Sequence, residues 1–192
     1  MGHGVHLEDL ELDLFSRRKT SVAHCPTSNY NLGSGLCDVK RLIKANIKVG
    51  LGTDVSGGCK PSILNTMNDA LSVSQSIGFV KKQIVKGSKS NEAPDTNYKA
   101  LNYKEVLYLA TLGGAEALSV DSKVGNFVRG KEFDALIVET FTGPIDKFNV
   151  PETFAHKSKK QKLLELVQRF VYVGDDRNIK QVFVQGKQVK VA

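Results

Sequence analysis

The sequence has little cysteine, no tryptophan and no long apolar run. Its 192 residues include three cysteines, Cys25, Cys37 and Cys59, which form no C-x-x-C pair. An odd number of cysteines without this pairing argues against a disulfide framework or a thiolate zinc site, and favours a reducing compartment. No apolar stretch is long enough to span a membrane, and no N-terminal signal peptide is recognisable. We therefore expect a soluble, cytoplasmic protein with no membrane partner.

Several well-known catalytic motifs are also absent. The sequence has no Walker A lysine motif, and the stretch 50–52 lacks the third glycine of a dinucleotide-binding loop. Ser34 and Ser56 lie in glycine-rich stretches, but neither forms a G-x-S-x-G nucleophile elbow. The H-x-E and P-C-x-x-C pattern of cytidine-type zinc deaminases does not occur. These absences argue against several common nucleotide-binding and hydrolase classes.

The charge pattern does not indicate a nucleic-acid partner. The formal net charge is +7, and the basic residues are scattered apart from one denser run over 157–162. Single-stranded nucleic-acid binding usually combines basic residues with aromatic ones, and this run contains no aromatic residue. Such a run is typical of a solvated face at the start of a helix. We expect no nucleic-acid partner.

The first part of the chain predicts strands that alternate with helices. Helices are predicted over 7–18 and 38–45, and strands over 19–24 and 47–54. Pro26 ends the first of these strands because proline cannot donate to a ladder, and residues after it are predicted to form a loop up to Gly35. A strand, a helix and a second strand in this order favour a right-handed parallel crossover.

The pattern changes near residue 121. The remaining predicted elements are a helix from Pro61 or Ser62 to about residue 77, a polar insertion over 87–98, a helix over 103–118 interrupted or bent at Gly113-Gly114, β-like runs over 124–127 and 135–138, a helix over 162–170 and a hairpin over 181–189. We therefore predict a parallel α/β portion over 1–121, followed by a small antiparallel β portion over 122–192.

Three polar residues end successive strand-like runs. They are His3, His24 and Asp54, spaced 21 and 30 residues apart, which fits successive βα units of roughly 30 residues. In parallel α/β folds, catalytic groups lie at the carboxyl edge of the strands. Imidazole nitrogen and carboxylate oxygen are ligands that zinc accepts. The structural alternative is that the histidines satisfy backbone groups and that Asp54 caps the next helix.

Other residues near these strand ends have less direct roles. His24 is as well suited to orienting the loop Thr27-Ser28-Asn29 as to binding a metal, so His24 and Asn29 are candidates for groups that support the site from behind. Cys25 follows His24, but neighbouring residues on a strand point to opposite faces, so they do not form a nucleophile pair. His6 lies at the start of a helix and is interpreted as a surface residue.

Together, the motifs resemble the amidohydrolase superfamily, and within it the guanine deaminases. The stretches that carry this resemblance are His3-Gly4-Val5-His6-Leu7, His24-Cys25-Pro26-Thr27-Ser28-Asn29, Gly50-Leu51-Gly52-Thr53-Asp54, and further ones over 109–115, 125–135 and 173–179. H-C-P and G-T-D are shared with triazine hydrolases and other nucleobase deaminases. The G-D-D-R-N-I stretch over 174–179 favours the guanine deaminases.

The resemblance implies an α/β fold. In the family this is a metal-dependent (β/α)₈ TIM-type barrel with a small antiparallel β domain. The motifs match the C-terminal portion, about strands 6–8 of the barrel, followed by part of the β domain. The family's H-x-H ligands, its catalytic glutamate and its fifth-strand histidine have no counterpart here. We therefore expect a fragment of a longer protein that, when it is expressed alone, is poorly soluble, or inactive if it is soluble.

The resemblance also implies roles for two residues. His3 matches the sixth-strand histidine, which helps to polarise water and move protons. Asp54 matches the eighth-strand aspartate, which binds zinc, contacts the substrate and accepts a proton. The implied enzyme is a hydrolase of the C–N bond of a cyclic amidine, converting guanine to xanthine and ammonia in purine catabolism. One Zn²⁺ is expected per complete site, with no tight binding to this chain alone, and a homodimer is expected for the complete protein.

Two other functions remain open from the sequence. One is a non-catalytic interaction protein derived from the barrel, which would form a discrete oligomer without metal or deaminase activity. The other is a related amidohydrolase that acts on another nucleobase or on a triazine. The residues expected to contact the substrate lie mostly outside this segment, so only the motif over 174–179 separates the substrates.

Overall fold

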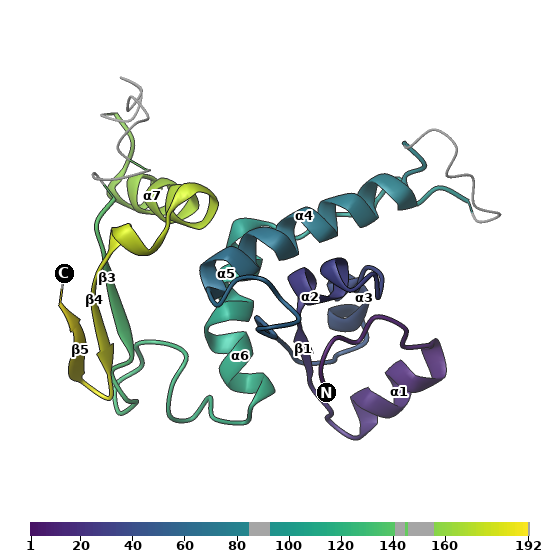
Figure 1. Cartoon of the computed structure of the whole chain (residues 1–192), viewed down its shortest axis with the longest axis horizontal. Helices are drawn as coiled ribbons and strands as arrows, with labels where there is room; N and C mark the ends of the chain where they lie inside the picture. The colour runs from purple at the N-terminus through teal and green to yellow at the C-terminus, as the bar shows by residue number, and fades with distance from the viewer. Residues whose placement is uncertain (85–92, 141–144, 146–155, 192) are drawn as a thin grey trace. The chain divides into compact units, whose positions relative to one another are not determined.

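The computed structural model describes residues 1–84, 93–140, 145 and 156–191. The chain divides into two compact units, Met1–Asp121 and Ser122–Ala192 (Figure 1). The insertion predicted over 87–98 lies partly outside the described residues. No helix in the described part of the chain is both long enough and apolar enough to cross a membrane.

Parallel strands form the centre of the first unit. Strand β1 (Val22–His24) pairs in parallel with β2 (Val49–Leu51), with His24 opposite Leu51. Gly2 forms a parallel bridge with Ala23, and the backbone N–H of His3 donates to the Ala23 carbonyl oxygen at 2.9 Å. The predicted parallel arrangement is therefore confirmed. All three segments run in the same direction, so their carboxyl ends lie at one edge of the sheet.

Helices follow each of these strand-like segments. Helix α1 (Asp9–Arg17) precedes β1, and helices α2 (Pro26–Asn31) and α3 (Val39–Lys44) connect β1 to β2. The prediction of a loop up to Gly35 was wrong for its first part. Pro26 occupies the first helical position, where its fixed φ favours a helix, and the Asn29 N–H donates to the Cys25 carbonyl oxygen at 3.0 Å.

Three further helices complete the first unit. They are α4 (Ile63–Lys81), α5 (Tyr103–Ala110) and α6 (Leu112–Ala117). Ser62 and Asn102 cap α4 and α5 through their side chains, as serine and asparagine commonly do. The helical backbone breaks at Thr111 and not at the two glycines that follow. Helices α5 and α6 pack against β2, and α4 packs against α2 (Figure 1).

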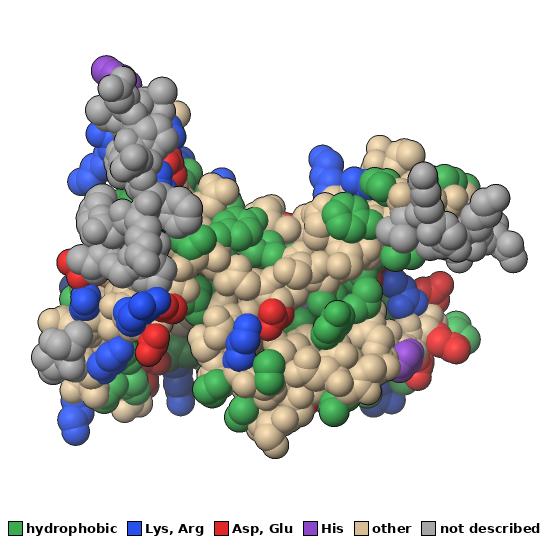
Figure 2. All heavy atoms as spheres, turned by 45° about the horizontal axis from the view of Figure 1, so that its top comes forward, with side chains coloured by type: hydrophobic (Ala, Val, Ile, Leu, Met, Phe, Trp, Pro, Cys, Tyr) green, Lys and Arg blue, Asp and Glu red, His purple; other side chains and the backbone are tan. Residues whose placement is uncertain are grey.

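The core of the first unit consists mainly of aliphatic residues from these elements. The most buried side chains include Val22, Leu42, Ala70, Val106 and Leu109. Many other apolar side chains remain exposed, among them Leu10, Tyr30 and Leu32. On the face that Figure 2 shows, such side chains reach the surface among polar and charged groups.

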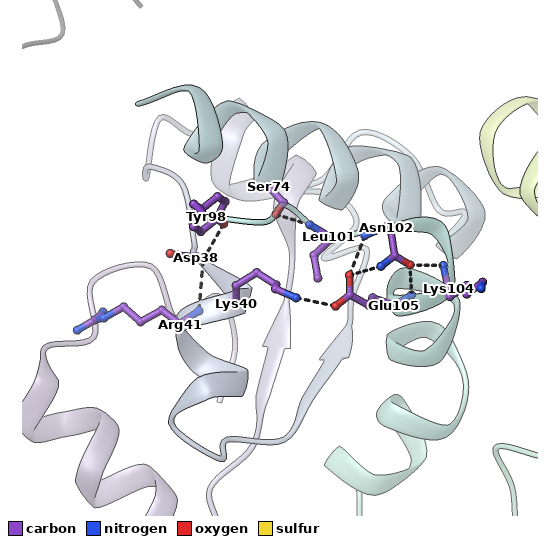
Figure 3. A network of polar contacts seen from close by, with 9 residues as sticks. All are labelled: Asp38, Lys40, Arg41, Ser74, Tyr98, Leu101, Asn102, Lys104 and Glu105. Atoms are coloured by element: carbon purple, nitrogen blue, oxygen red, sulfur yellow. Dashed lines mark hydrogen bonds and ion pairs between the residues drawn. The ribbon is translucent and has the colours of Figure 1, made fainter. Parts of the chain in front are cut away.

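A polar network joins α3 to neighbouring helices and to the segment before α5 (Figure 3). Asp38 caps α3 by accepting a hydrogen bond from the Arg41 N–H at 3.3 Å, and it also accepts one from the Tyr98 hydroxyl at 3.0 Å. Lys40 of α3 pairs with Glu105 of α5 at 2.6 Å. Partly exposed ion pairs of this kind contribute about 0–1 kcal/mol each, so the network orients the helices more than it stabilises them.

The second unit contains an antiparallel sheet and one long helix. The strand order is β3 (Ala135–Val138), β4 (Ile179–Val184) and β5 (Lys187–Val191), and helix α7 (Lys159–Val173) precedes the 3₁₀ helix η2 (Asp176–Asn178). The predicted run over 135–138 and the terminal hairpin are confirmed. The β-like run predicted over 124–127 was wrong, because residues 124–126 form a bend, in which Gly125 has a φ of 101°. The basic run lies at the start of α7, mostly exposed, as predicted.

Candidate active site

His3 and Asp54 meet at the carboxyl edge of the parallel strands. The distance between His3 Nε2 and Asp54 Oδ2 is 3.7 Å, and the two side chains are 44% and 42% exposed. His3 ends the first strand-like segment and Asp54 follows β2, so they approach each other from either side of β1. The structure thus brings together two of the three residues that the sequence singled out.

Both residues have a positive φ, which is uncommon for residues other than glycine. His3 has a φ of 67° and Asp54 a φ of 48°. The other described non-glycine residues with positive φ either follow a helix or lie in the hairpin turn, where this conformation is common: Lys19, Asn46, Gln83, Ser119 and Gln185. Strained conformations cost of order 1–3 kcal/mol and cluster at functional sites. The two strand ends therefore direct His3 and Asp54 toward each other at some cost in stability.

Two adjacent residues of α2 hold this pair. Asn29 Oδ1 lies 2.7 Å from His3 Nδ1, and the Ser28 hydroxyl donates to Asp54 Oδ2 at 2.6 Å. Ser28 is 0% exposed and Asn29 is 2% exposed. Neither hydrogen bond therefore competes directly with solvent at its α2 end. The predicted supporting position of Asn29 thus has a direct geometric counterpart, although its role stays a prediction.

The loop after β2 closes tightly over the hydrogen bond between Ser28 and Asp54. A Cβ on Gly57 would lie 2.8 Å from both Asp54 Oδ2 and Ser28 Oγ. Real Cβ atoms do not approach other heavy atoms this closely. Gly57 is therefore required by space and not by backbone conformation.

Cys25 lies close to the pair but remains a thiol. Its Sγ contacts the Ala23 carbonyl oxygen at 3.4 Å, and a Cβ on Gly52 would lie 3.0 Å from that sulfur. Burial raises the pKa of the Cys25 thiol, the His3 backbone N–H opposes this, and the Asp54 carboxylate adds to it. Because the thiolate is the nucleophilic form, the environment of Cys25 argues against nucleophilic catalysis.

His24 does not join His3 and Asp54. It is 1% exposed and shares the buried side of β1 with Val22, while Ala23 faces the other way. Burial, and secondarily the proximity of His3, lowers the pKa of His24 to about 4, so its ring is neutral. Within the described residues neither of its ring nitrogens has a hydrogen-bond partner. Its supporting role stays a prediction, whereas His6 is exposed as predicted.

Sequence reasoning missed Ser28 and Gly57. The stretch after Pro26 was interpreted as a loop, so nothing indicated that Ser28 and Asn29 project from one helical turn toward two different strand ends. The available signal was the proline at the first helical position, followed directly by small polar residues. The tight fit of Gly57 is a long-range contact that no local pattern reports.

The donor atoms fit part of a metal site. An imidazole nitrogen and a carboxylate oxygen suit a divalent cation such as zinc. Among the described residues, however, no group of three or more His, Cys, Asp or Glu side chains is placed to hold a metal ion. His3 and Asp54 therefore fit such a site in kind, but they supply fewer donors than a catalytic zinc site requires.

A separate pocket of about 510 Å³ lies between α2 and α4. Its lining includes Thr27 and Asp69, which are joined by a hydrogen bond of 2.5 Å, but it includes neither His3 nor Asp54. The pocket therefore does not define the candidate active site.

Comparison with known proteins places these observations in a family. The model of the amidohydrolase family matches residues 1–189. Guanine deaminase of Mus musculus is 44% identical over 191 residues, which are 98% of this chain and 38% of that protein. The solved structure of E. coli guanine deaminase superposes with a TM-score of 0.78 at 34% identity, and the match covers 100% of this chain and 39% of that one.

A second solved structure contains a ligand. Guanine deaminase from C. acetobutylicum, with guanine bound in its active site, superposes with a TM-score of 0.71 at 32% identity. The match covers 98% of this chain and 38% of that one. The chain thus spans about two fifths of the length of the relatives that it matches.

Proposed function

The chain belongs to the amidohydrolase family, and from this premise we propose that it supplies part of the active site of an enzyme that hydrolyses guanine to xanthine and ammonia. The observation that carries the proposal is the approach of His3 Nε2 to Asp54 Oδ2 at 3.7 Å, at the edge where α/β folds place their chemistry. The similarity to guanine deaminases, at 32–44% identity in the matches described above, supports guanine as the substrate.

Asp54 has the chemistry of a proton acceptor and of a metal ligand. Its carboxylate is 42% exposed, and among the described residues only Oδ2 accepts a hydrogen bond, from Ser28. In the proposed reaction Asp54 accepts the proton of the attacking water and returns it to the departing amine. Its free oxygen would also serve as one ligand of a divalent cation, together with donors from outside this chain.

His3 handles protons beside Asp54. Its Nε2 faces the Asp54 carboxylate and is accessible, while its Nδ1 is engaged by Asn29. His3 orients the water and carries a proton during the transfer from water to the leaving amine. When bound, a divalent cation such as zinc lowers the pKa of water, which makes hydroxide available near neutral pH.

The same proposal includes the assignment of these strands to a barrel and of the second unit to a small β domain. Residues 1–3, β1 and β2 would correspond to strands 6, 7 and 8 of a (β/α)₈ barrel, because they follow one another in parallel order. The unit Ser122–Ala192 would contribute part of the small β domain, which its antiparallel sheet supports. We expect the completed protein to be a homodimer in the cytoplasm, which gel filtration and cell fractionation would check.

The proposal is tested by completing the chain with a relative. The matching segment of E. coli guanine deaminase is replaced with residues 1–192, and the purified chimera is assayed for xanthine and ammonia from guanine. Adenosine and a chlorotriazine serve as alternative substrates. We expect turnover of guanine by the chimera and no turnover by residues 1–192 alone, because the described residues hold no three-donor group.

Two results would overturn the proposal. One is a folded, metal-loaded chimera that does not convert guanine. The other is guanine turnover by the isolated chain that persists after rigorous removal of contaminating enzyme. A preference for adenosine or for the triazine would retain the hydrolytic chemistry but reject guanine as the substrate.

A further inference from the structure

We propose that Asn29 and Ser28 are positioning residues: Asn29 fixes the tautomer of His3, and Ser28 fixes the orientation of the Asp54 carboxylate. The inference rests on the proposed function, because it assigns these residues to the same site. Its basis is that neighbouring residues of one helical turn each bond one member of the pair. Nothing in the sequence pattern separates these bonds from ordinary loop contacts.

Asn29 selects the tautomer of His3. Asn29 Oδ1 can only accept a hydrogen bond, and it lies 2.7 Å from His3 Nδ1. With the amide oxygen facing His3, the arrangement favours a proton on Nδ1, which in a neutral imidazole leaves a lone pair on Nε2. Since Asn29 is 2% exposed, water does not readily replace this acceptor.

The backbone keeps Asn29 in place. Its N–H donates to the Cys25 carbonyl oxygen at 3.0 Å, and its own carbonyl oxygen accepts from the Ser34 N–H at 2.8 Å. Pro26 sets the first turn of the same helix. The acceptor is thus held from both sides and does not depend on side-chain packing alone.

Ser28 sets the orientation of the Asp54 carboxylate. The Ser28 hydroxyl donates to Oδ2 at 2.6 Å, and the same oxygen faces His3 Nε2. Among the described residues, Oδ1 of Asp54 has no hydrogen-bond partner. The absence of a side chain at Gly57 leaves space for this hydrogen bond, since a Cβ there would lie 2.8 Å from both Asp54 Oδ2 and Ser28 Oγ.

Asn29 and Ser28 together direct two acceptor atoms, His3 Nε2 and Asp54 Oδ2, toward the same space. Nε2 and Oδ2 are 3.7 Å apart, which is too long for a direct hydrogen bond, and with the proton on Nδ1 the Nε2 atom offers a lone pair beside the carboxylate oxygen. The space beside them therefore suits a proton donor or a cation. Water and the N–H groups of a purine belong to the first class, and a divalent metal belongs to the second.

The tautomer is directly measurable in residues 1–192. The chain contains four histidines, so ¹⁵N-histidine labelling gives few signals, and the His3→Gln variant assigns those of His3. Spectra are recorded without metal at about pH 9.5, roughly three units above the ordinary histidine pKa, so that a normal imidazole is neutral. We expect His3 to be found with its proton on Nδ1.

Three variants separate positioning from folding. Asn29→Ala removes the acceptor, so we expect the His3 proton to redistribute toward Nε2. Asn29→Asp keeps an acceptor oxygen and should retain the Nδ1–H form. Ser28→Ala leaves Asn29 intact and serves as the matched control, with the tautomer unchanged. Unchanged signals from His6, His24 and His156 report that the fold persists.

The outcomes decide the inference independently of guanine turnover. A wild-type chain with the proton on Nε2 would overturn it, as would an Asn29→Ala variant that folds and keeps the Nδ1–H form. In the completed chimera, Asn29→Ala should lower kcat by roughly ten- to a hundredfold with little change in KM. A chimera that is inactive on guanine contradicts the proposed function and leaves the tautomer result standing.

Discussion

His24 makes the stability of the first unit depend on pH. The ring is 1% exposed, and burial, with a smaller effect from His3, lowers the pKa of His24 from 6.5 to about 4. As the pH falls, His24 therefore binds a proton in the unfolded chain before it does so in the folded state. The stabilisation that comes from a neutral His24 is fully present above about pH 6.5 and is lost as the pH falls toward about 4.

The prediction at this site concerns the His24→Phe variant. Between about pH 7 and pH 4, the free energy of unfolding of the wild type should fall by up to about 3 kcal/mol more than that of the variant. The variant keeps an aromatic ring in the buried space but removes the titration. Urea unfolding, followed by circular dichroism at several pH values, measures the difference. Parallel pH profiles of the two proteins would contradict this account of His24.

Of the residues at the candidate active site, only some could be predicted from the sequence. His3 and Asp54 were identifiable because each ends a strand-like run, and strand ends in parallel folds converge. The contacts of Ser28 and Gly57 were not, since they depend on how α2 and the loop after β2 approach each other. Local patterns carry no information on distances between segments so far apart in the chain.

At the scale of elements, two glycines allow β2 to lie directly against α6. A Cβ on Gly50 would lie 3.0 Å from the Gly114 Cα and 3.6 Å from the Ala117 Cβ. The sheet and the helix therefore pack at a distance that only a missing side chain permits. Asp54 lies three residues after the end of β2, so the position of this strand against α6 also influences the position of the carboxylate.

The Gly50→Ala variant tests this packing. The added methyl group must push β2 and α6 apart, so we expect the free energy of unfolding to fall by about 1–3 kcal/mol. Gly2→Ala is the matched control, because a Cβ at Gly2 meets nothing within 4 Å and should change stability little. Chemical denaturation of both variants measures the effect. Equal free energies of unfolding for the two variants would contradict the prediction, because they would show that β2 and α6 accommodate the added methyl group.

Helices and strands were predicted best where caps and periodicity agreed. Helix α4 begins at Ile63, close to the start predicted at Pro61 or Ser62, and α5 begins at Tyr103 as predicted. The prediction failed for α2, because small polar residues favour loops and the proline before them outweighed that preference. It failed again at Thr111, where the helix breaks one residue before α6 begins and the glycines themselves remain helical.

At the scale of the whole molecule, the chain carries only part of the chemistry that its family relationship implies. It spans about two fifths of the length of the relatives that it matches. Its described residues bring one imidazole and one carboxylate together but hold no three-donor metal group. We therefore expect activity to depend on groups that this chain does not contain, with His3 and Asp54 as its own contribution.

The central claim is that Asp54 is a catalytic group of a guanine-hydrolysing site. It is tested most directly by the rate of xanthine formation from guanine in the completed chimera. The account predicts that Asp54→Asn lowers kcat at least about a hundredfold, because the amide neither accepts the proton nor binds a cation as a carboxylate does. Asp13→Asn, at a side chain that is 75% exposed, should leave the rate unchanged. An Asp54→Asn chimera that retains the wild-type rate within a few-fold would contradict the account.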